Sequence, residues 1–258
     1  MRLMKRILSA AAMLALSASL LVGCSSGTAS SVPVSASSAA ESTVSSVEET
    51  ASSAVDENEA AAAQLLNDLT GSYQELWPVI LADEYKQTWL DDCTALVGED
   101  NAEAAFEKLS SMVTGDVYGE DAVKAYANGG GAYFCGFTNS LAILTFDGET
   151  STISGTDKDG NVLFSHAYHY IGMEPVRGLY EFESDDADSG EFTYFFLAPD
   201  TSAETYHIEF RYGSDAEALS QYDTGEYAYW LASGISTDCD QTMIDNCIEL
   251  FCTENLAG

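Results

Sequence analysis

Basic residues are scarce in this chain of 258 residues, which has 9 Lys+Arg against 42 Asp+Glu and a formal net charge of −33. A surface with this charge repels nucleic acid and anionic lipid headgroups, and it attracts cations. We therefore expect no DNA or RNA partner, and we expect cations to gather near the protein.

Signatures of catalysis are also missing. The sequence has no Gly-rich phosphate loop, no G-x-S-x-G elbow and no H-E-x-x-H motif. With 3 histidines, any Ser-His-Asp assignment would be arbitrary. The cysteines form no C-x-x-C motif, so those beyond the N-terminal leader are expected to be buried thiols, with room for one disulfide. These absences favour a binding protein over an enzyme.

The N-terminal stretch MRLMKRILSAAAMLALSASLLVGC has the pattern of an export signal, with a basic start, an apolar run and small residues before a cysteine. Its last four residues, Leu21-Val22-Gly23-Cys24, resemble a bacterial lipobox, which implies cleavage after residue 23 and lipidation of Cys24. The expected location is the extracytoplasmic face of a bacterial membrane. The alternative is an ordinary secretory leader in which Cys24 occurs by chance.

Residues 24–58 are predicted to be a disordered tether. They consist mostly of Ser, Ala, Thr, Val and Glu, with no aromatic residue and no apolar periodicity. Such a segment cannot bury enough surface to fold. The sequence therefore divides into a lipoprotein signal peptide at 1–23, the tether, and one folded domain at 59–258.

Helical patterns come first in the folded part. Residues 59–81 are predicted to be one helix, because apolar residues recur at the 3.6-residue period, with a weak point at Gly71. A second helix is expected over 101–113, capped by Asn101, and a short third one over 119–127.

Strand patterns begin at Gly129, where short runs of β-branched and aromatic residues alternate with turns. The pairs Asp147-Gly148 and Asp159-Gly160 are typical of hairpins. Later strands are expected at 176–184, 190–198 and 205–213.

The C-terminal segments 215–235 and 239–255 return to helical composition. Helices, then an antiparallel meander of about six or more strands, then helices predict an α+β chain built around a barrel or strongly curved sheet.

The stretch AETYHIEFRYGSD holds the most suggestive polar residues. If it is a strand, His207, Glu209 and Arg211 share one face, because side chains alternate along a strand. A histidine and a glutamate two residues apart can converge on one metal ion, with ligand atoms about 2.1 Å from it. The alternative is a solvated face with an ion pair between Glu209 and Arg211.

The other two histidines lie in the stretch VLFSHAYHY. Strand parity puts His166 on the face of Phe164, Tyr168 and Tyr170, and it puts His169 on the opposite face. A histidine among aromatic residues is usually a packed or surface residue, and a metal ligand is the alternative.

Two motifs resemble one known family, the ZinT (YodA) family of exported zinc-binding proteins. The stretch LNDLTGSYQELWP resembles the opening of that family through Leu66, Asp68, Gly71, Tyr73, Trp77 and Pro78. The stretch HIEFRYGSD resembles its metal-binding strand, which carries a His-x-His pair six and four residues before a Gly-x-Asp turn. Counting back from Gly213 places His207 on the first histidine and Glu209 on the second.

The resemblance implies a lipocalin-like (calycin) antiparallel β-barrel with flanking helices, and a zinc or similar divalent ion held by three histidines at one end of it. This chain departs from the pattern, because Glu209 replaces one histidine and the position of another falls near Phe195. The expected ligand set is therefore His166, His207 and Glu209, with His169 as the alternative third ligand.

The expected function is that of a lipid-anchored protein that captures a divalent ion, with zinc as the expected cofactor, and passes it to a metal uptake system. The alternative is a lipocalin-like lipoprotein that binds a small apolar ligand after decay of its metal site. Phe195, Tyr168 and Tyr170 would then line its pocket.

Overall fold

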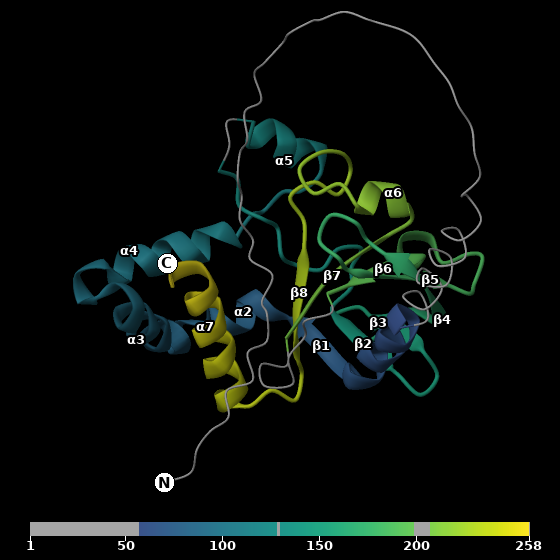
Figure 1. Ribbon diagram of the computed structural model, residues 1–258, viewed down its shortest axis with the longest axis horizontal. Helices are drawn as coiled ribbons and strands as arrows, with labels where there is room; N and C mark the ends of the chain where they lie inside the picture. The colour runs from purple at the N-terminus through teal and green to yellow at the C-terminus, as the bar shows by residue number, and fades with distance from the viewer. Residues whose placement is uncertain (1–56, 128–129, 199–206, 258) are drawn as a thin grey trace, which may run out of the picture. The chain divides into compact units, whose positions relative to one another are not determined.

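The computed structural model describes residues 57–127, 130–198 and 207–257 (Figure 1). The predicted signal peptide, the lipidation site Cys24 and almost all of the predicted tether lie outside the described residues. No helix within the described ranges is long and apolar enough to cross a membrane.

The described chain contains eight strands and several helices in a defined order. It begins with helical residues 57–68. There follow β1 (Gly71–Glu75), α2 (Leu76–Ile80), a 3-10 turn (Asp83–Tyr85), α3 (Lys86–Val97), α4 (Glu99–Met112), α5 (Glu120–Ala125), β2 (Ile143–Asp147), β3 (Thr152–Thr156), β4 (Val162–Met173), β5 (Tyr180–Ser184), a second 3-10 turn (Gly190–Phe192), β6 (Tyr194–Leu197), β7 (His207–Gly213), α6 (Ala216–Leu219), β8 (Ala232–Ser236) and α7 (Gln241–Leu256).

The eight strands form a closed antiparallel barrel in sequence order. Each strand pairs with the next, and β1 closes the barrel against β8 with Tyr73 opposite Ser236 and Glu75 opposite Gly234. Up-and-down barrels with this strand order are typical of lipocalin-like folds. The predicted fold class, an α+β chain with an antiparallel barrel and flanking helices, is confirmed.

Aromatic side chains fill the barrel interior. On β7, Ile208, Phe210 and Tyr212 are buried in the barrel core, so the alternate residues of this strand face outward. The ring of Tyr212 lies 5.0 Å from that of Trp230 and 5.3 Å from that of Phe195, measured between centroids. The inward faces of the strands thus form one contiguous core.

The first helix contributes Leu65 and Leu66 to the same core, and Leu69 joins them from the turn that follows the helix. It passes so close to the β2–β3 turn that a Cβ at Gly148 would lie 2.4 Å from the Cα of Asn67. This close approach of the backbone therefore requires glycine at position 148.

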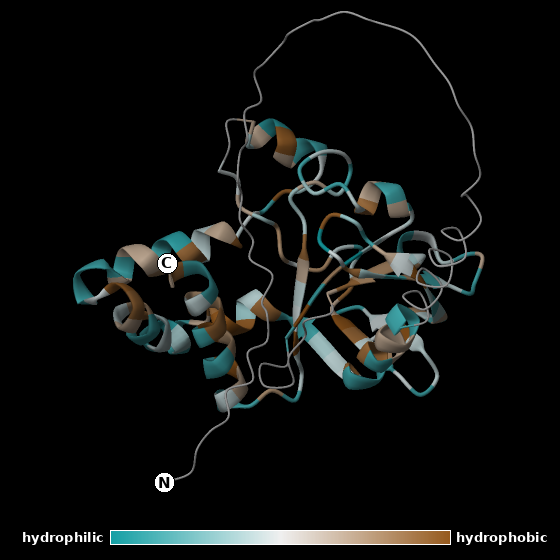
Figure 2. Cartoon of the chain, viewed as in Figure 1, coloured by the Kyte–Doolittle hydropathy of each residue, from teal (hydrophilic) through white to brown (hydrophobic). Residues whose placement is uncertain are grey.

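A second hydrophobic core lies between the outer face of the barrel and the helices α2, α3, α4 and α7. Ile235 on β8 belongs to this core, together with Trp77 on α2 and Trp89 on α3. The indole nitrogen of Trp89 donates to the carbonyl of Ile80 at 2.7 Å. Hydrophobic and hydrophilic residues alternate around α4 and α7, as expected for helices that bury one side (Figure 2).

Three of the expected helices need correction. The helix expected over 59–81 ends at 68, because residues 71–75 form β1 and α2 begins a new helix at Leu76. The segment 215–235 holds only the short α6 before β8, so helix was the wrong expectation for most of it. The helix expected over 101–113 is α4, which begins at Glu99, so Asn101 lies inside it and is not its cap.

Both predicted hairpin turns are confirmed. The Asp147-Gly148 pair lies between β2 and β3, and the Asp159-Gly160 pair lies between β3 and β4. In the second turn the carboxylate of Asp157 accepts backbone N–H bonds from Asp159 at 2.9 Å and from Asn161 at 2.8 Å. The carboxylate of Asp157 therefore stabilises the turn itself.

Candidate functional site

The outward face of β7 carries His207, Glu209 and Arg211, as the alternation of the sequence predicts. His207 and Glu209 are half-buried, and Arg211 is fully buried. Across the ladder His207 lies opposite Ile235, and Glu209 lies opposite Ser233. This face is therefore exposed only in part: Arg211 is buried, whereas His207 and Glu209 keep some contact with solvent.

Arg211 holds the segment after α6 onto the barrel. Its Nη1 donates to the carbonyls of Leu219 and of Gln221, the latter at 3.1 Å, and its Nη2 donates to the carbonyl of Tyr227. Its Nε has no hydrogen-bond partner among the described residues. Burial lowers the pKa of Arg211 to about 10, so the side chain still carries its charge at neutral pH.

Tyr222 lies between two guanidinium groups in sequence-distant parts of the chain. The Cζ atom of Arg177 is 4.3 Å from the centre of its ring, and that of Arg211 is 4.4 Å away. The hydroxyl of Tyr222 lies 3.4 Å from the carboxylate of Glu174, which is fully buried and accepts two backbone N–H bonds in its own loop. Cation–π contacts and a buried carboxylate thus stabilise the outside of the barrel beside β7.

Glu209 acts electrostatically on two buried thiols. Burial raises the pKa of Cys135 to about 12, and the charge of Glu209 is the second cause. The same two causes, in the same order, raise the pKa of Cys247 to about 12. In the absence of a metal ion, both thiols are therefore protonated at neutral pH.

His166 and His169 each bind an aspartate of the segment after β5. The Nδ1 of His166 lies 2.6 Å from the Oδ2 of Asp186, and the Nδ1 of His169 lies 2.7 Å from the Oδ1 of Asp185. His166 is opposite Ile153, a residue of the barrel core, whereas His169 is on the outward face. The predicted parity of these two histidines is confirmed.

The structure brings two of the three predicted metal ligands to one face. His207 and Glu209 are neighbours on the outside of β7, whereas His166 is on the inward face of β4, and β5 and β6 separate the two strands in the barrel. Among the residues that the structure describes, no group of three or more His, Cys, Asp or Glu side chains is placed to hold a metal ion. The described residues thus fit a zinc site only in part, because such sites usually take three or four protein ligands.

The Gly-x-Asp turn after β7 has a clear structural role. A Cβ at Gly213 would lie 2.5 Å from the hydroxyl oxygen of Tyr227, so only glycine leaves room for that ring. Asp215 caps α6 by accepting a hydrogen bond from the backbone nitrogen of Ala218 at 3.1 Å. This motif therefore fixes how the chain leaves the strand that carries His207 and Glu209.

The opening motif connects the barrel to the helices. Gly71 has a φ of 146°, which favours glycine, and it begins β1. Tyr73 packs edge-on against Phe146 inside the barrel, with ring centroids 5.6 Å apart. Trp77 packs against Phe251 of α7, with centroids 4.8 Å apart. The segment 66–78 thus contributes side chains first to the barrel core and then to the second hydrophobic core.

The residues proposed to line an apolar pocket pack against other rings instead. Phe195 is fully buried, and its ring centroid lies 5.4 Å from that of Tyr168 and 5.8 Å from that of Phe164. The hydroxyl of Tyr168 donates to the carbonyl of Phe192. Tyr170 packs edge-on against Phe182. These contacts are those of a filled core.

Sequence reasoning missed the anchoring role of Arg211. The signal was present, because a single arginine occurs between the buried Phe210 and Tyr212 in a chain with very few basic residues. Its partners, however, are backbone carbonyls. Every residue has one, so the sequence does not indicate which carbonyls accept from Arg211.

Comparison with known proteins finds solved structures that are similar to the chain, among them two of the protein AdcA. No family model and no curated protein matches the chain. The crystal structure of the Zn(II)-bound ZinT-like domain of AdcA from Streptococcus pneumoniae is 15% identical, with a TM-score of 0.45, over 71% of this chain and 89% of that one. The crystal structure of Zn(II)-bound AdcA from Streptococcus pneumoniae is 14% identical, with a TM-score of 0.42, over 72% of this chain and 35% of that one. At this similarity the function must be argued from the residues of this chain.

Proposed function

We propose that this chain is an exported, lipid-anchored protein that binds a divalent metal ion, with zinc as the first candidate, through His207 and Glu209. Its role is to bind the ion, without catalysis, and to pass it to a metal uptake system. Cys24 anchors the chain in the membrane, and the segment after it spaces the domain from the lipid surface.

The position of His207 and Glu209 carries the proposal. The two residues are two positions apart on one strand, so their side chains extend from the same face. The Cα atoms of such a pair are about 7 Å apart, and the imidazole and the carboxylate can reach the same metal ion from there. Both are half-buried, so an ion bound there is partly shielded from water, which strengthens its attraction to the carboxylate.

The charge of the protein supports the same proposal. A formal net charge of −33 raises the local concentration of cations around the domain. An imidazole and a carboxylate are both ligands that zinc accepts. With two protein ligands and water in the remaining positions, the affinity is expected to be in the micromolar range, weaker than that of a closed structural site.

Zinc titration of the chelator-treated protein tests this proposal. In isothermal titration calorimetry with magnesium present in excess, the protein is expected to bind one zinc ion with micromolar affinity. The double variant His207→Ala/Glu209→Ala should weaken this binding at least about 100-fold, because it removes both protein ligands. The excess magnesium occupies non-specific sites on the acidic surface. The heat measured on adding zinc therefore reports binding at the site formed by His207 and Glu209.

Two single variants serve as controls for this titration. His169→Ala removes an exposed imidazole on another strand and should leave zinc binding unchanged. His166→Ala tests the predicted third ligand, and it too should leave zinc binding unchanged because this side chain faces away from the site. Failure of the wild-type protein to bind zinc at micromolar levels, or unaltered binding by the double variant, would refute the proposal.

Lipid anchoring can be tested in cells. The wild-type chain is expected in the membrane fraction and should incorporate a labelled fatty acid, whereas Cys24→Ser should lose the label and be released from the membrane. Fractionation and label incorporation measure both effects. Equal labelling of the two proteins would contradict the assignment of Cys24.

A further inference from the structure

Cysteine side chains are concentrated in the core between the barrel and the helices. Cys93, Cys135, Cys247 and Cys252 are buried there, and Cys239 is half-buried beside them. In this structure all five are in the reduced, unbonded form. Two of them, Cys93 on α3 and Cys252 on α7, have their sulfur atoms 3.9 Å apart.

The packing of α3 against α7 fixes this pair. Phe251, next to Cys252, lies edge-on to Trp77 and to Trp89, with ring centroids 4.8 Å and 6.0 Å away. Cys93 and Cys252 are both fully buried. The two thiols therefore stay in contact for as long as the two helices are packed together.

We propose that Cys93 and Cys252 form a disulfide bond that ties α3 to the C-terminal helix α7. A disulfide bond is about 2.05 Å long, so closing the present gap of 3.9 Å needs about 2 Å of movement, shared between two side chains. The inference does not depend on metal binding. It agrees with the proposed export, because disulfides form and persist outside the cytosol.

The bond forms by two thiol–disulfide exchange steps. One thiolate attacks the disulfide of an oxidant, either a thiol oxidoreductase or oxidised glutathione, and releases one thiol of that oxidant. The second thiolate then attacks the mixed disulfide and releases the other thiol. The two cysteines thus lose two protons and two electrons, and the oxidant is reduced to two thiols.

Burial determines when this exchange happens. In the folded chain burial raises the pKa of Cys252 and of Cys93, so little thiolate is present and no oxidant reaches it. Exchange therefore takes place while α7 is still undocked. Once α7 has packed, the same burial protects the bond from reductants.

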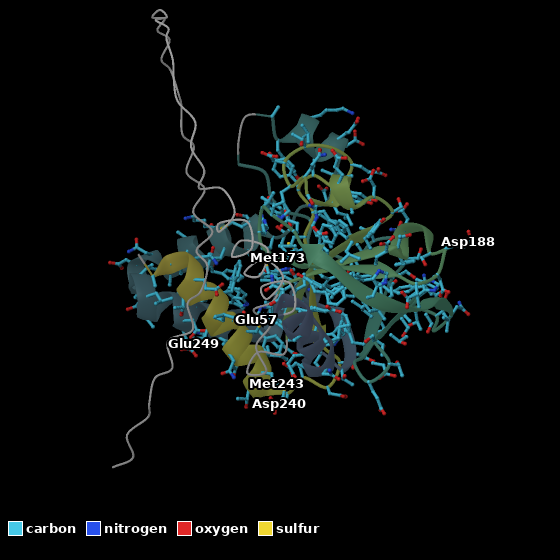
Figure 3. All side chains as sticks on the ribbon, turned by 45° about the vertical axis from the view of Figure 1, so that its right-hand side comes forward. Glu57, Met173, Asp188, Asp240, Met243 and Glu249 are labelled. Carbon is cyan, nitrogen blue, oxygen red and sulfur yellow. The ribbon has the colours of Figure 1, made fainter. Side chains whose placement is uncertain are left out.

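The disulfide would offset a repulsion between the two helices. Asp92 on α3 has a raised pKa, first because of burial and then because of the charges of Glu249 and Asp245 on α7. Figure 3 labels Glu249 on α7, three residues before Cys252. Carboxylates of α3 and of α7 thus lie close together where the two helices pack, and they repel one another. A disulfide bond would hold the helices together against this repulsion.

Refolding of the full chain in glutathione buffer tests the proposal. The denatured, reduced protein is refolded with reduced and oxidised glutathione and is digested without reductant. Mass spectrometry should find one cross-linked peptide pair, holding Cys93 and Cys252 and lighter than the separate peptides by two hydrogens. The oxidised protein is expected to melt about 10 °C above the protein refolded with a phosphine reductant.

Two variants complete the test. In Cys93→Ala/Cys252→Ala the difference in melting temperature between oxidising and reducing conditions should vanish, whereas Cys239→Ala should retain it. The peptide map of the wild-type chain needs no variant, so it decides the question even if the double variant folds poorly. A cross-link between any other cysteines, or a full set of free thiols after refolding in oxidised glutathione, would overturn the proposal.

Discussion

Replacement of Arg211 by methionine is expected to lower the free energy of unfolding by about 3–5 kcal/mol. Methionine fills a similar volume but donates no hydrogen bond, so the carbonyls of Leu219, Gln221 and Tyr227 lose their partner. A buried carbonyl without a partner costs about 1–3 kcal/mol, and the contact with the ring of Tyr222 is lost as well. Urea unfolding followed by circular dichroism measures the loss.

Arg177→Met is the matched control for this experiment. Arg177 contacts the ring of Tyr222 at nearly the same distance, but it is only half-buried and its side chain donates to the hydroxyl of Tyr133. Its replacement should cost about 1 kcal/mol or less, because water can solvate the groups that it leaves. Equal losses for the two variants would show that stacking on Tyr222, and not the carbonyl bonds of Arg211, stabilises this part of the protein.

Phe195→Ala is expected to destabilise the protein by a similar amount, about 3–5 kcal/mol. The side chain is fully buried among Phe164, Tyr168, Phe210 and Tyr212, so its removal leaves a cavity that the closed barrel cannot collapse to fill. The cavity should bind a small apolar probe such as benzene, which would raise the melting temperature of the variant but not that of the wild-type protein.

Tyr194→Ala is the control for this second prediction. Tyr194 is the neighbour of Phe195 on β6, but it is on the outward face, half-buried, with its hydroxyl 3.2 Å from the carboxylate of Glu183. We expect a cost of about 1 kcal/mol and no effect of benzene. If benzene or a longer apolar ligand stabilised the wild-type protein, the interior would be an open site, and the alternative of a lipocalin-like ligand-binding protein would gain support.

Most of the barrel could be predicted from the sequence, but the two strands that close it could not. Strands β2 to β7 carry β-branched and aromatic residues between recognisable turns. In contrast, β1 reads GSYQE and β8 reads ASGIS, which are short and rich in small residues. These two segments become strands because each completes the hydrogen bonds of the other, and this reason lies in the tertiary structure.

The candidate site could be predicted within a strand but not between strands. Alternation correctly placed His207 and Glu209 on one face of β7, because the side-chain period of a strand is two residues. It could not relate that face to the face of His166 on β4. The inward or outward sense of each strand depends on turns and register shifts along the barrel, such as the shift between Gly155 and Thr156.

Closure of the barrel by β1 and β8 also has a consequence for how the chain folds. Tyr73 pairs with Ser236, which lies near the other end of the described chain, so the contacts that close the barrel have a high contact order. A nascent chain that ends before residue 232 lacks this partner for β1 and cannot close the barrel. Folding is therefore expected to be slow and to finish only after nearly the whole chain is available. Under the proposed export, this delay would keep the chain unfolded until it has crossed the membrane.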